Sequence, residues 1–489
     1  MLSKSSYLTG LQCHKALYLS CFQPGLRGSL GQAEQARLQE GREVGMVARG
    51  LFPVGVDIAA SATLDLEARA QATQRAIAQG AKVIYEAAFI HDSVYAALDI
   101  LVHLGNYWVI HEVKASTQVK EEHILDVALQ LHVARGAGLA IDGVHIVTLN
   151  NAYVRQGDID PKRLFRITSV QEQVMAEAPF IPLRISEMKA VLASGVEPQR
   201  AIGPQCSKPH ACSFMEHCWK DLPKPSVLDL TRGGRRVWEL YGQGIRLIKD
   251  IPSSEKLTTP QQRQVDAWKS GLVHIDVPAV RGFVNALRYP LHHFDFETFL
   301  PAIPLYEGTR PYQQLPFQYS LHIQLAPGVD PVHKEFLADG SADPREQLIQ
   351  QLLEDIESEG DILVYHIQFE RERLLELARD LPHYAAPLQG IIARLKDLEE
   401  PFKSGHYYAP GMNGSSSIKS VLPALVPELS YADLNVRDGS TASMLFTQLA
   451  LGRYAGDVPA LRTDLLAYCG LDTRAMVEIL RVLENAVSN

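Results

Sequence analysis

Three segments in the first half of the chain have the pattern of apolar and polar residues that is typical of β-strands. They cover residues 82–89, 93–104 and 107–114. The sequence Leu104-Gly105-Asn106, between the last two segments, is typical of a hairpin turn. Helical patterns are found at residues 31–50, 65–80 and 121–137, and a further strand is expected at 143–149. This order of elements predicts an α/β unit over residues 1–220.

A second α/β unit is predicted over residues 286–489. Strands are expected near Glu297, at 316–324 and at 361–365, and helices at 344–358, 369–379 and 459–486. The residues between the two units, 221–285, contain short helical segments separated by prolines. Because proline ends helices, this stretch is predicted to be a helical connector.

Composition narrows the class of protein. With 489 residues the chain is too long for one core, and its 46% hydrophobic and 21% charged residues are those of a folded protein. No apolar run approaches the roughly 20 residues of a membrane span, and the first residues lack the apolar segment of a signal peptide. We therefore expect a cytoplasmic protein with no membrane partner.

The net charge of −9 argues against an extended surface that coats nucleic acid, but it does not exclude an enzyme that acts on nucleic acid. Acidic metal sites add negative charge, and a local group of arginines can still bind phosphate. Arg232, Arg235 and Arg236 form such a group. The alternative is that these three side chains lie on a solvated face.

Asp295 and Glu297 lie two residues apart between large apolar residues. On a β-strand they would project from the same face, where two neighbouring carboxylates repel each other. A divalent cation removes this repulsion, so an Asp-x-Glu strand is a candidate metal site. The motif is short, and alone it is more typical of an amphipathic strand with a wet face.

Distant segments supply partners for this pair. Glu370 lies in the first turn of a helix after a buried strand, and Tyr468 and Asp472 lie four apart on the last predicted helix. This order, over residues 290–489, resembles the tyrosine-bearing branch of the DEDD exonuclease superfamily, which has the RNase H-like fold. The resemblance implies that the four acids bind two divalent ions and that Tyr468 orients the attacking water.

The sequence departs from the superfamily pattern in one segment, where Glu370 replaces an Asp and His366 replaces an Asn. His366 either hydrogen-bonds substrate or is simply packed. A Gly- and Ser-rich loop before Lys419 offers backbone N–H groups and one cation to a phosphate, or else it starts a capped helix. Cys469, beside Tyr468, is expected to be an ordinary buried thiol.

The first unit contains a second set of charged residues. Asp99 lies on one predicted strand, and Glu112 and Lys114 alternate onto one face of the next. This set resembles the PD-(D/E)XK nucleases, which implies that both acids hold a metal and that Lys114 assists water deprotonation or stabilises the transition state. Gln130, on the following helix, resembles the helix motif of RecB-like members, although Ala134 replaces the tyrosine often found there. Glu86 is a further ligand or a group on the substrate side.

Six cysteines in a large chain of this kind are not expected to form a disulfide framework. Cys13 near the start and Cys206, Cys212 and Cys218 after the first unit resemble the iron–sulfur ligands of RecB-like CRISPR-associated nucleases. The resemblance implies a structural [4Fe–4S] cluster, with zinc as the alternative. Cys21 is the competitor of Cys13.

The whole chain resembles a bacterial family of predicted RecB-like nucleases fused to an RNase H-like domain. This implies a nuclease that uses Mg²⁺ or Mn²⁺ at two centres and acts on the ends of DNA, or less readily RNA, in repair, CRISPR adaptation or anti-phage defence. The alternatives are a nucleic-acid-binding or scaffold protein with one or both centres inactive, and a redox-sensing role for the cluster. The sequence predicts no particular protein partner.

Overall fold

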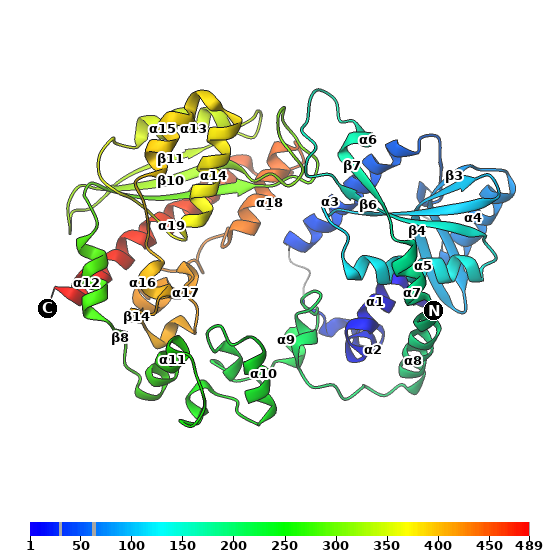
Figure 1. Ribbon diagram of the computed structural model, residues 1–489, viewed down its shortest axis with the longest axis horizontal. Helices are drawn as coiled ribbons and strands as arrows, with labels where there is room; N and C mark the ends of the chain where they lie inside the picture. Colours follow the sequence, from blue (N-terminus) through cyan, green and yellow to red (C-terminus); the bar gives the residue numbers. More distant parts are fainter. Residues whose placement is uncertain (29–31, 61–64, 489) are drawn as a thin grey trace. The chain divides into compact units, whose positions relative to one another are not determined.

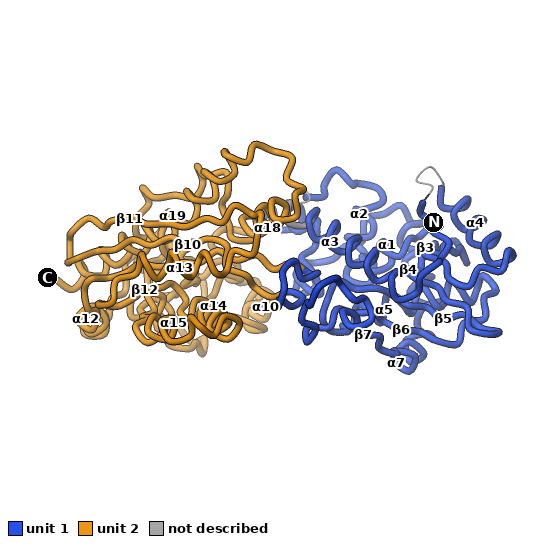
Figure 2. Tube along the Cα trace, turned by 90° about the horizontal axis from the view of Figure 1, so that it is seen from above, with its two compact units in different colours: residues 1–221, 302–312 blue, residues 222–301, 313–489 orange. Residues whose placement is uncertain are grey.

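The structure is a computed structural model that describes residues 1–28, 32–60 and 65–488 (Figure 1). The chain divides into two compact units (Figure 2). Unit 1 contains residues 1–221 and 302–312, and unit 2 contains residues 222–301 and 313–489. Each unit has helices packed on its own mixed sheet, which confirms the α/β class.

The core of unit 1 is a sheet with the order β2-β3-β4-β5-β6-β7, to which β1 adds in parallel beside β4. Neighbouring strands are antiparallel except for the parallel pairs β1/β4, β2/β3 and β5/β6. The strands are β1 Leu2–Ser3, β2 Val56–Asp57, β3 Val83–His91, β4 Val94–Leu104, β5 Tyr107–Lys114, β6 Ile141–Leu149 and β7 Phe165–Ser169. The three predicted strands and the strand expected at 143–149 are confirmed as β3, β4, β5 and β6.

Helix α5 connects β5 to β6, as a parallel strand pair requires. It packs with α1 and α4 on one face of the sheet, through residues such as Val127 and Leu131 against Ile110 and Leu98. Helix α3 covers the opposite face through Val44 and neighbours. The helices of this unit are α1 Lys4–Gln12, α2 His14–Phe22, α3 Gln32–Ala48, α4 Leu66–Ala78, α5 Glu121–Gly136, α6 Pro161–Leu164, α7 Gln171–Glu177, α8 Ile181–Ser194 and α9 Met215–Cys218.

Unit 2 is built on a five-stranded sheet with the order β11-β10-β9-β12-β13. Its central strand β9 is antiparallel to β10 and parallel to β12. The strands are β9 Leu291–Phe299, β10 Leu315–Gln324, β11 Val332–Leu337, β12 Ile362–Val364 and β13 Leu395–Asp397, and β8 His274–Ile275 pairs separately with β14 Tyr407–Tyr408.

Helices cover both faces of this sheet (Figure 1). Phe294 and Phe296 of β9 pack towards α13 and α14 on one face. The apolar side of α19, including Met476, forms the core on the other face. The helices are α10 Gly234–Gly242, α11 Thr259–Ser270, α12 Val277–Asn285, α13 Arg345–Asp355, α14 Ile367–Asp380, α15 Ala385–Ile392, α16 Glu400–Lys403, α17 Ile418–Leu425, α18 Gly439–Ala450 and α19 Val458–Val487.

Two segments fall where the sequence did not place them. Residues 222–285, expected to be a connector, belong to unit 2, with the small core around Leu240 and Val265. Residues 302–312, between β9 and β10, belong to unit 1, where the Tyr312 hydroxyl donates to the carbonyl of Ala115 over 2.8 Å. The boundary between the units is therefore crossed more than once by the chain.

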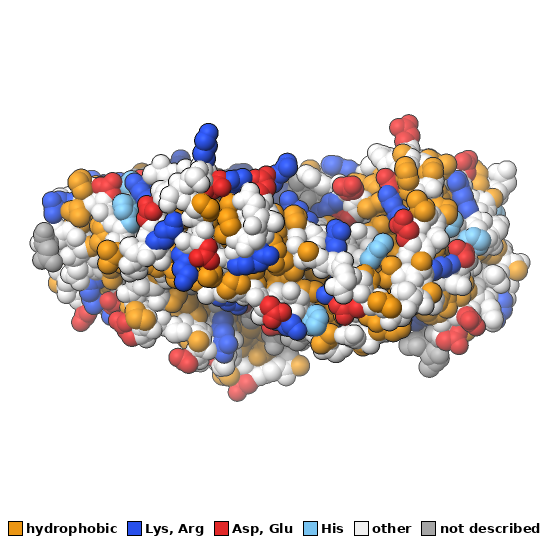
Figure 3. Space-filling view, turned by 90° about the horizontal axis from the view of Figure 1, so that it is seen from below, with side chains coloured by type: hydrophobic (Ala, Val, Ile, Leu, Met, Phe, Trp, Pro, Cys, Tyr) orange, Lys and Arg blue, Asp and Glu red, His pale blue; other side chains and the backbone are white. Residues whose placement is uncertain are grey.

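Two surface properties bear on possible partners. Among the described residues, no helix combines the length and apolar character that a membrane span requires. On the face drawn in Figure 3, Lys and Arg side chains are interspersed with Asp and Glu side chains. A partner that binds through charge must therefore be held by local groups of residues on that face.

Candidate active sites

Four acids of unit 2 converge on one face of its sheet. Strand β9 carries Asp295 and Glu297 on the face towards α19, because alternate residues of a strand share a face. The first turn of α14 supplies Glu370, whose carboxyl lies beside that of Asp295, and each of the two acids affects the pKa of the other. Helix α19 supplies Asp472, whose charge acts on both acids of β9. The structure therefore brings together all four acids that the sequence singled out.

Burial raises the pKa of each of these acids, and the neighbouring carboxylates raise the pKa of three of them further. The pKa of Asp472 rises only to about 6, because hydrogen bonds from Tyr431 and Tyr468 and the charge of Lys419 oppose the effect of burial. Glu370 is almost fully buried, and its Oε2 has no hydrogen-bond partner. Crowded carboxylates with an unpartnered oxygen fit a divalent cation, which would favour their charged forms.

Tyr468 lies at the edge of this acid cluster, one helical turn before Asp472. Its hydroxyl accepts a hydrogen bond from Lys419 Nζ over 3.0 Å, and the ammonium lies 5.0 Å from the centre of the Tyr468 ring. Tyr431 donates its hydroxyl proton to Asp472 Oδ1 over 2.5 Å. The sequence noted Lys419 as a possible phosphate contact but gave no sign of Tyr431.

Two small or buried residues complete the walls of this site. A Cβ atom added to Gly439, the first residue of α18, would lie 3.3 Å from Glu297 Oε2, so the absence of a side chain lets this helix start close to the acid. Cys469 lies with Asp295 and Glu297, with ligand atoms all within 4.8 Å of one another. Burial and the nearby acids raise the pKa of this thiol, so it stays neutral and is a poor metal ligand.

His366 does not join the acids directly. It is exposed, and its Nδ1 lies 3.0 Å from Glu399 Oε2. The other carboxylate oxygen of Glu399 accepts a hydrogen bond from Ser416 Oγ over 2.7 Å. The Gly- and Ser-rich loop is therefore tied through Glu399 to the N-cap residue of α14, four positions before Glu370.

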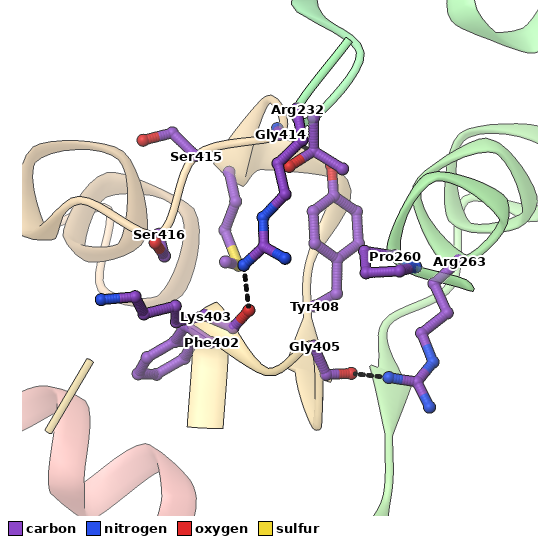
Figure 4. A pocket seen from close by; sticks show the side chains of 12 residues that line it. Arg232, Pro260, Arg263, Phe402, Lys403, Gly405, Tyr408, Gly414, Ser415 and Ser416 are labelled. Carbon is purple, nitrogen blue, oxygen red and sulfur yellow. Dashed lines mark hydrogen bonds between the residues drawn. The ribbon is translucent and has the colours of Figure 1, made fainter. Parts of the chain in front are cut away.

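A hollow with three basic residues lies beyond this loop (Figure 4). Arg232 extends into it and Arg263 lies at one side, and they donate hydrogen bonds to the carbonyls of Lys403 and Gly405 over 3.3 and 2.8 Å. No acidic residue is among the described residues that line it. Of the arginine group noted in the sequence, Arg232 lies here, while Arg235 and Arg236 form ion pairs with Glu239.

The second charged group lies on the α5 face of the unit 1 sheet. Lys114 Nζ is 2.8 Å from Glu112 Oε1 and 2.5 Å from Asp126 Oδ2. Asp99 Oδ2 accepts a hydrogen bond from the backbone N–H of Val113 over 2.7 Å. Gln130 donates to Asp126 Oδ1 over 3.0 Å. Glu112, Lys114 and Gln130 thus lie in one network with Asp126, and Asp99 is bonded to the backbone of Val113, between Glu112 and Lys114.

The acids of this group differ from those of unit 2 because two lysine side chains, Lys4 and Lys114, form ion pairs with them. Burial opposes the charged forms of Glu112 and Lys114, but their mutual attraction outweighs it and lowers the pKa of Glu112 while raising that of Lys114. Burial and the charge of Glu112 raise the pKa of Asp99 to about 8. The buried Oε2 of Glu112 has no hydrogen-bond partner, so this oxygen and Asp99 fit a divalent cation.

Two residues of this group were not expected from the sequence. Asp126 lies four positions before Gln130 on α5, a spacing that places both on one helix face and could have identified it. Lys4 reaches Glu112 Oε1 at 2.7 Å and Asp126 Oδ2 at 3.4 Å from the start of the chain. Glu86, whose pKa burial raises, lies 3.8 Å from Arg49, and its charge also acts on Asp99.

The four cysteines expected to act together line one cavity in unit 1. Cys13, Cys206, Cys212 and Cys218 surround it with Lys15 and Arg200. The chain start is tied to the later segment by Gln12, whose Nε2 donates to the carbonyls of Gln205 and His210 over 2.8 and 2.7 Å. Cys21, the competitor of Cys13, is exposed and lies near Ser20.

The spacing of these thiols bears on the group that fits them. All four cysteines are described, and no three of their sulfur atoms lie within 4.8 Å of one another. Sulfur atoms around one zinc ion, with Zn–S bonds of about 2.3 Å, would be roughly 3.8 Å apart. Burial raises the pKa of Cys212 and Cys218, so a metal must displace their protons on binding. Four thiols around one cavity are the donor set of an iron–sulfur cluster or, if the sulfur atoms move closer together, of a zinc ion.

Comparisons with known proteins cover part of the chain. Residues 292–417 match the family model described as a domain of unknown function (DUF2779). This stretch contains Asp295, Glu297 and Glu370, but it ends before Tyr468 and Asp472.

Similar curated proteins come from mollicutes. An uncharacterized protein of Mycoplasma genitalium is 25% identical over 246 residues, which cover 46% of this chain and 36% of that protein. An uncharacterized homolog in Mycoplasma pneumoniae is 27% identical over 233 residues, covering 40% and 32%. An uncharacterized protein of Ureaplasma parvum is 27% identical over 260 residues, covering 48% and 37%. The chain spans about a third of the length of these relatives.

Proposed function

We propose that this protein is a metal-dependent nuclease that hydrolyses phosphodiester bonds, with a DEDD-type centre in unit 2 and a PD-(D/E)XK-type centre in unit 1. The observation that carries the proposal is the convergence of Asp295, Glu297, Glu370 and Asp472 from β9, α14 and α19, with raised pKa values. The energetic cost of burying these acids without a cation argues against a purely structural role.

In unit 2 the four acids would hold divalent ions. Bound ions there supply Lewis-acid stabilisation of the phosphate and lower the pKa of water. Tyr468, hydrogen-bonded to Lys419 and Asp472, orients a water molecule at its hydroxyl. Lys419 adds a positive charge where negative charge develops on the phosphate. The strand order, with β10 antiparallel to the central β9 that bears two of the acids, supports an RNase H-like arrangement.

In unit 1 the metal would be held by Asp99 and by Glu112 through its unpartnered oxygen. A metal there supplies the same Lewis-acid chemistry. Lys114, whose ammonium lies 2.8 Å from Glu112 Oε1, stabilises charge on the attacked phosphate. The succession of the antiparallel β3, β4 and β5, then α5, then β6 parallel to β5, supports a PD-(D/E)XK-like arrangement.

The substrate we propose is a nucleic acid with an accessible end, DNA in preference to RNA. Support comes from the hollow lined by Arg232, Arg263 and Lys403, which offers cations to phosphates without a lining acid. The setting we propose is repair, CRISPR adaptation or defence against phage. The four cysteines would hold a [4Fe–4S] cluster that ties the chain start to residues 206–218.

The test is cleavage of end-labelled single-stranded and double-stranded DNA and RNA by the full chain with Mg²⁺ or Mn²⁺. We expect shortened DNA products that appear with either metal and disappear with a chelator. Asp330→Asn is the matched control, because Asp330 is largely exposed and its carboxylate lies 3.7 Å from Arg481, which belongs to neither acid group. No cleavage of any substrate by protein with its cysteine-bound group intact would refute the proposal.

A second candidate function is nucleic-acid binding with the unit 1 centre inactive. It is favoured by the pairing of Lys4 and Lys114 with Glu112 and Asp126, which already neutralises two acids without a metal. In that case Lys114→Met would leave all cleavage unchanged, and binding of DNA would not require a divalent ion.

A further inference from the structure

Helix α1 joins the unit 1 acids to the cysteine cavity. Its first residue, Lys4, lies 2.7 Å from Glu112, and its last residue, Gln12, directly precedes Cys13. With nine residues the helix is about 13 Å long at the usual rise per residue. Helix α1 therefore carries an ion-pair partner of the unit 1 acids at its start and directly precedes a cysteine of the cavity at its end.

Both ends of α1 are anchored. At the start, the N–H of Leu2 donates to the carbonyl of Ser93 over 3.0 Å, and the Ser3 side chain caps the helix by accepting from the N–H of Ser6. At the end, Gln12 donates to two carbonyls of the cysteine segment. Between them, Gly10 packs so closely on Met188 of α8 that an added Cβ would lie 2.6 Å from its sulfur. The helix cannot slide without losing this contact.

The position of Lys4 matters for the acids it contacts. Lys4 and Lys114 share the same oxygen of Glu112 and the same oxygen of Asp126. Two cations on Oε1 fix the Glu112 carboxylate and leave its Oε2 as the oxygen with no partner. Without Lys4, Glu112 would be held from one side only, by Lys114.

We propose that Lys4 is a positioning residue of the unit 1 centre and that the four-cysteine group holds Lys4 in place through α1. The inference rests on the proposed function of that centre. Cys13, which directly follows α1, anchors the end of this helix to the cysteine group. When that group is lost, the helix samples open states in which the Lys4 ammonium leaves Glu112. The cysteine group thereby controls the geometry of the acids without touching them.

The first test measures how accessible the Lys4 amine is. The full chain is treated briefly with acetic anhydride, and acetylation of each lysine is read by mass spectrometry in wild type, Cys13→Ser and Cys206→Ser. We expect Lys4 to react at least about threefold faster in both variants, because a paired ammonium is protected until the local structure opens. Lys82, whose ammonium lies 3.2 Å from His103 Nδ1 in the same unit, is the internal control and should not change.

Two further variants distinguish the expected exposure of Lys4 from general misfolding of the protein. Gln12→Ala keeps all four thiols but removes both hydrogen bonds to the cysteine segment, so Lys4 should again react faster. Cys21→Ser is the matched cysteine control and should behave as wild type, since Cys21 is exposed. Unchanged Lys4 acetylation in Cys13→Ser and Gln12→Ala, with native circular dichroism, would overturn the proposal.

A second readout separates positioning from general stability. In an Asp295→Asn, Glu297→Gln background, calorimetry reports Mn²⁺ binding to the remaining centre. We expect Lys4→Met to change the dissociation constant at least about threefold and Lys4→Arg to restore it, because an arginine keeps the charge. Lys82→Met should have no effect, and an equal effect of Lys4→Met and Lys82→Met would contradict the inference. Neither readout needs cleavage, so failure of the nuclease proposal would be seen separately.

Discussion

The ammonium of Lys419 donates a hydrogen bond to the hydroxyl of Tyr468 over 3.0 Å. The two residues come from different helices, α17 and α19, and meet beside Asp472. Burial and the nearby acids raise the pKa of Tyr468, so this hydroxyl keeps its proton and can act as a donor. The pair gives the acid cluster one cation and one hydrogen-bond donor at the place where a water molecule and a phosphate would lie.

Replacing Lys419 should therefore reduce catalysis more than binding. We expect Lys419→Met to lower kcat of the unit 2 centre about 100-fold, the scale typical for loss of one group that stabilises the transition state. Lys419→Arg should recover part of this loss. Lys256→Met, an exposed lysine of the same unit, is the control. A rise in KM with unchanged kcat in Lys419→Met would contradict this prediction.

The acid cluster predicts that stabilisation by metal depends on pH. The raised pKa values mean that the folded protein holds extra protons, so the contribution of these groups to stability is present at low pH and is lost as pH rises through about 6 for Asp472 and higher for the others. A divalent cation replaces those protons. The rise in Tm on adding Mn²⁺ should therefore be large at about pH 8 and small at about pH 5.

The metal-induced rise in Tm is the quantity to compare, because other groups also titrate. Burial lowers the pKa of His293 to about 4, so this residue costs stability as pH falls below its unfolded value. That effect is the same with and without metal. An Asp295→Asn, Glu297→Gln variant should show a much smaller rise at high pH, and an equal rise in both proteins would refute a metal site in unit 2.

Glu370 is the acid that departs from the superfamily pattern, and its removal should have opposite effects on stability and function. Glu370→Gln removes one of the crowded carboxyls, so the metal-free protein should gain about 1 kcal/mol in free energy of unfolding. Cleavage and metal binding at this centre should be lost. Glu372→Gln, on the same helix but exposed, should change neither. Denaturant unfolding and calorimetry measure both quantities.

Much of the fold could be predicted from the sequence because the strands are long and regularly patterned. Residues 83–91, 94–104 and 107–114 form the strands expected, and α19 runs from Val458 to Val487 where a long terminal helix was predicted. The short strands β1, β2 and β8, of two residues each, carry no such pattern. They exist because the sheet or a neighbouring strand offers backbone partners.

The sites could be predicted where residues follow a local spacing. Asp295 with Glu297, Glu112 with Lys114, and Tyr468 with Asp472 are such pairs. Lys4 could not be found in this way, because it reaches Glu112 across 108 positions through the pairing of β1 with β4. Tyr431 likewise meets Asp472 across 41 positions from a segment without regular structure.

The cysteine cavity makes a prediction about bound metal. Protein purified without oxygen should contain iron and sulfide and absorb visible light, as iron–sulfur proteins do. Cys206→Ser and Cys212→Ser should lose this absorption, while Cys21→Ser should keep it. A colourless protein that contains stoichiometric zinc would contradict this prediction, because the four cysteines would then bind zinc and not an iron–sulfur cluster.

Inactivating the two hydrolytic centres one at a time shows whether each acid group cleaves nucleic acid. Cleavage of end-labelled DNA is measured with Mg²⁺ for wild type, Asp295→Asn, Lys114→Met and the double variant, with Asp330→Asn as control. The account predicts that each single variant loses a different part of the product pattern and that the double variant is inactive. Unchanged cleavage by the double variant would contradict it, because neither group of acids would then be responsible for the chemistry.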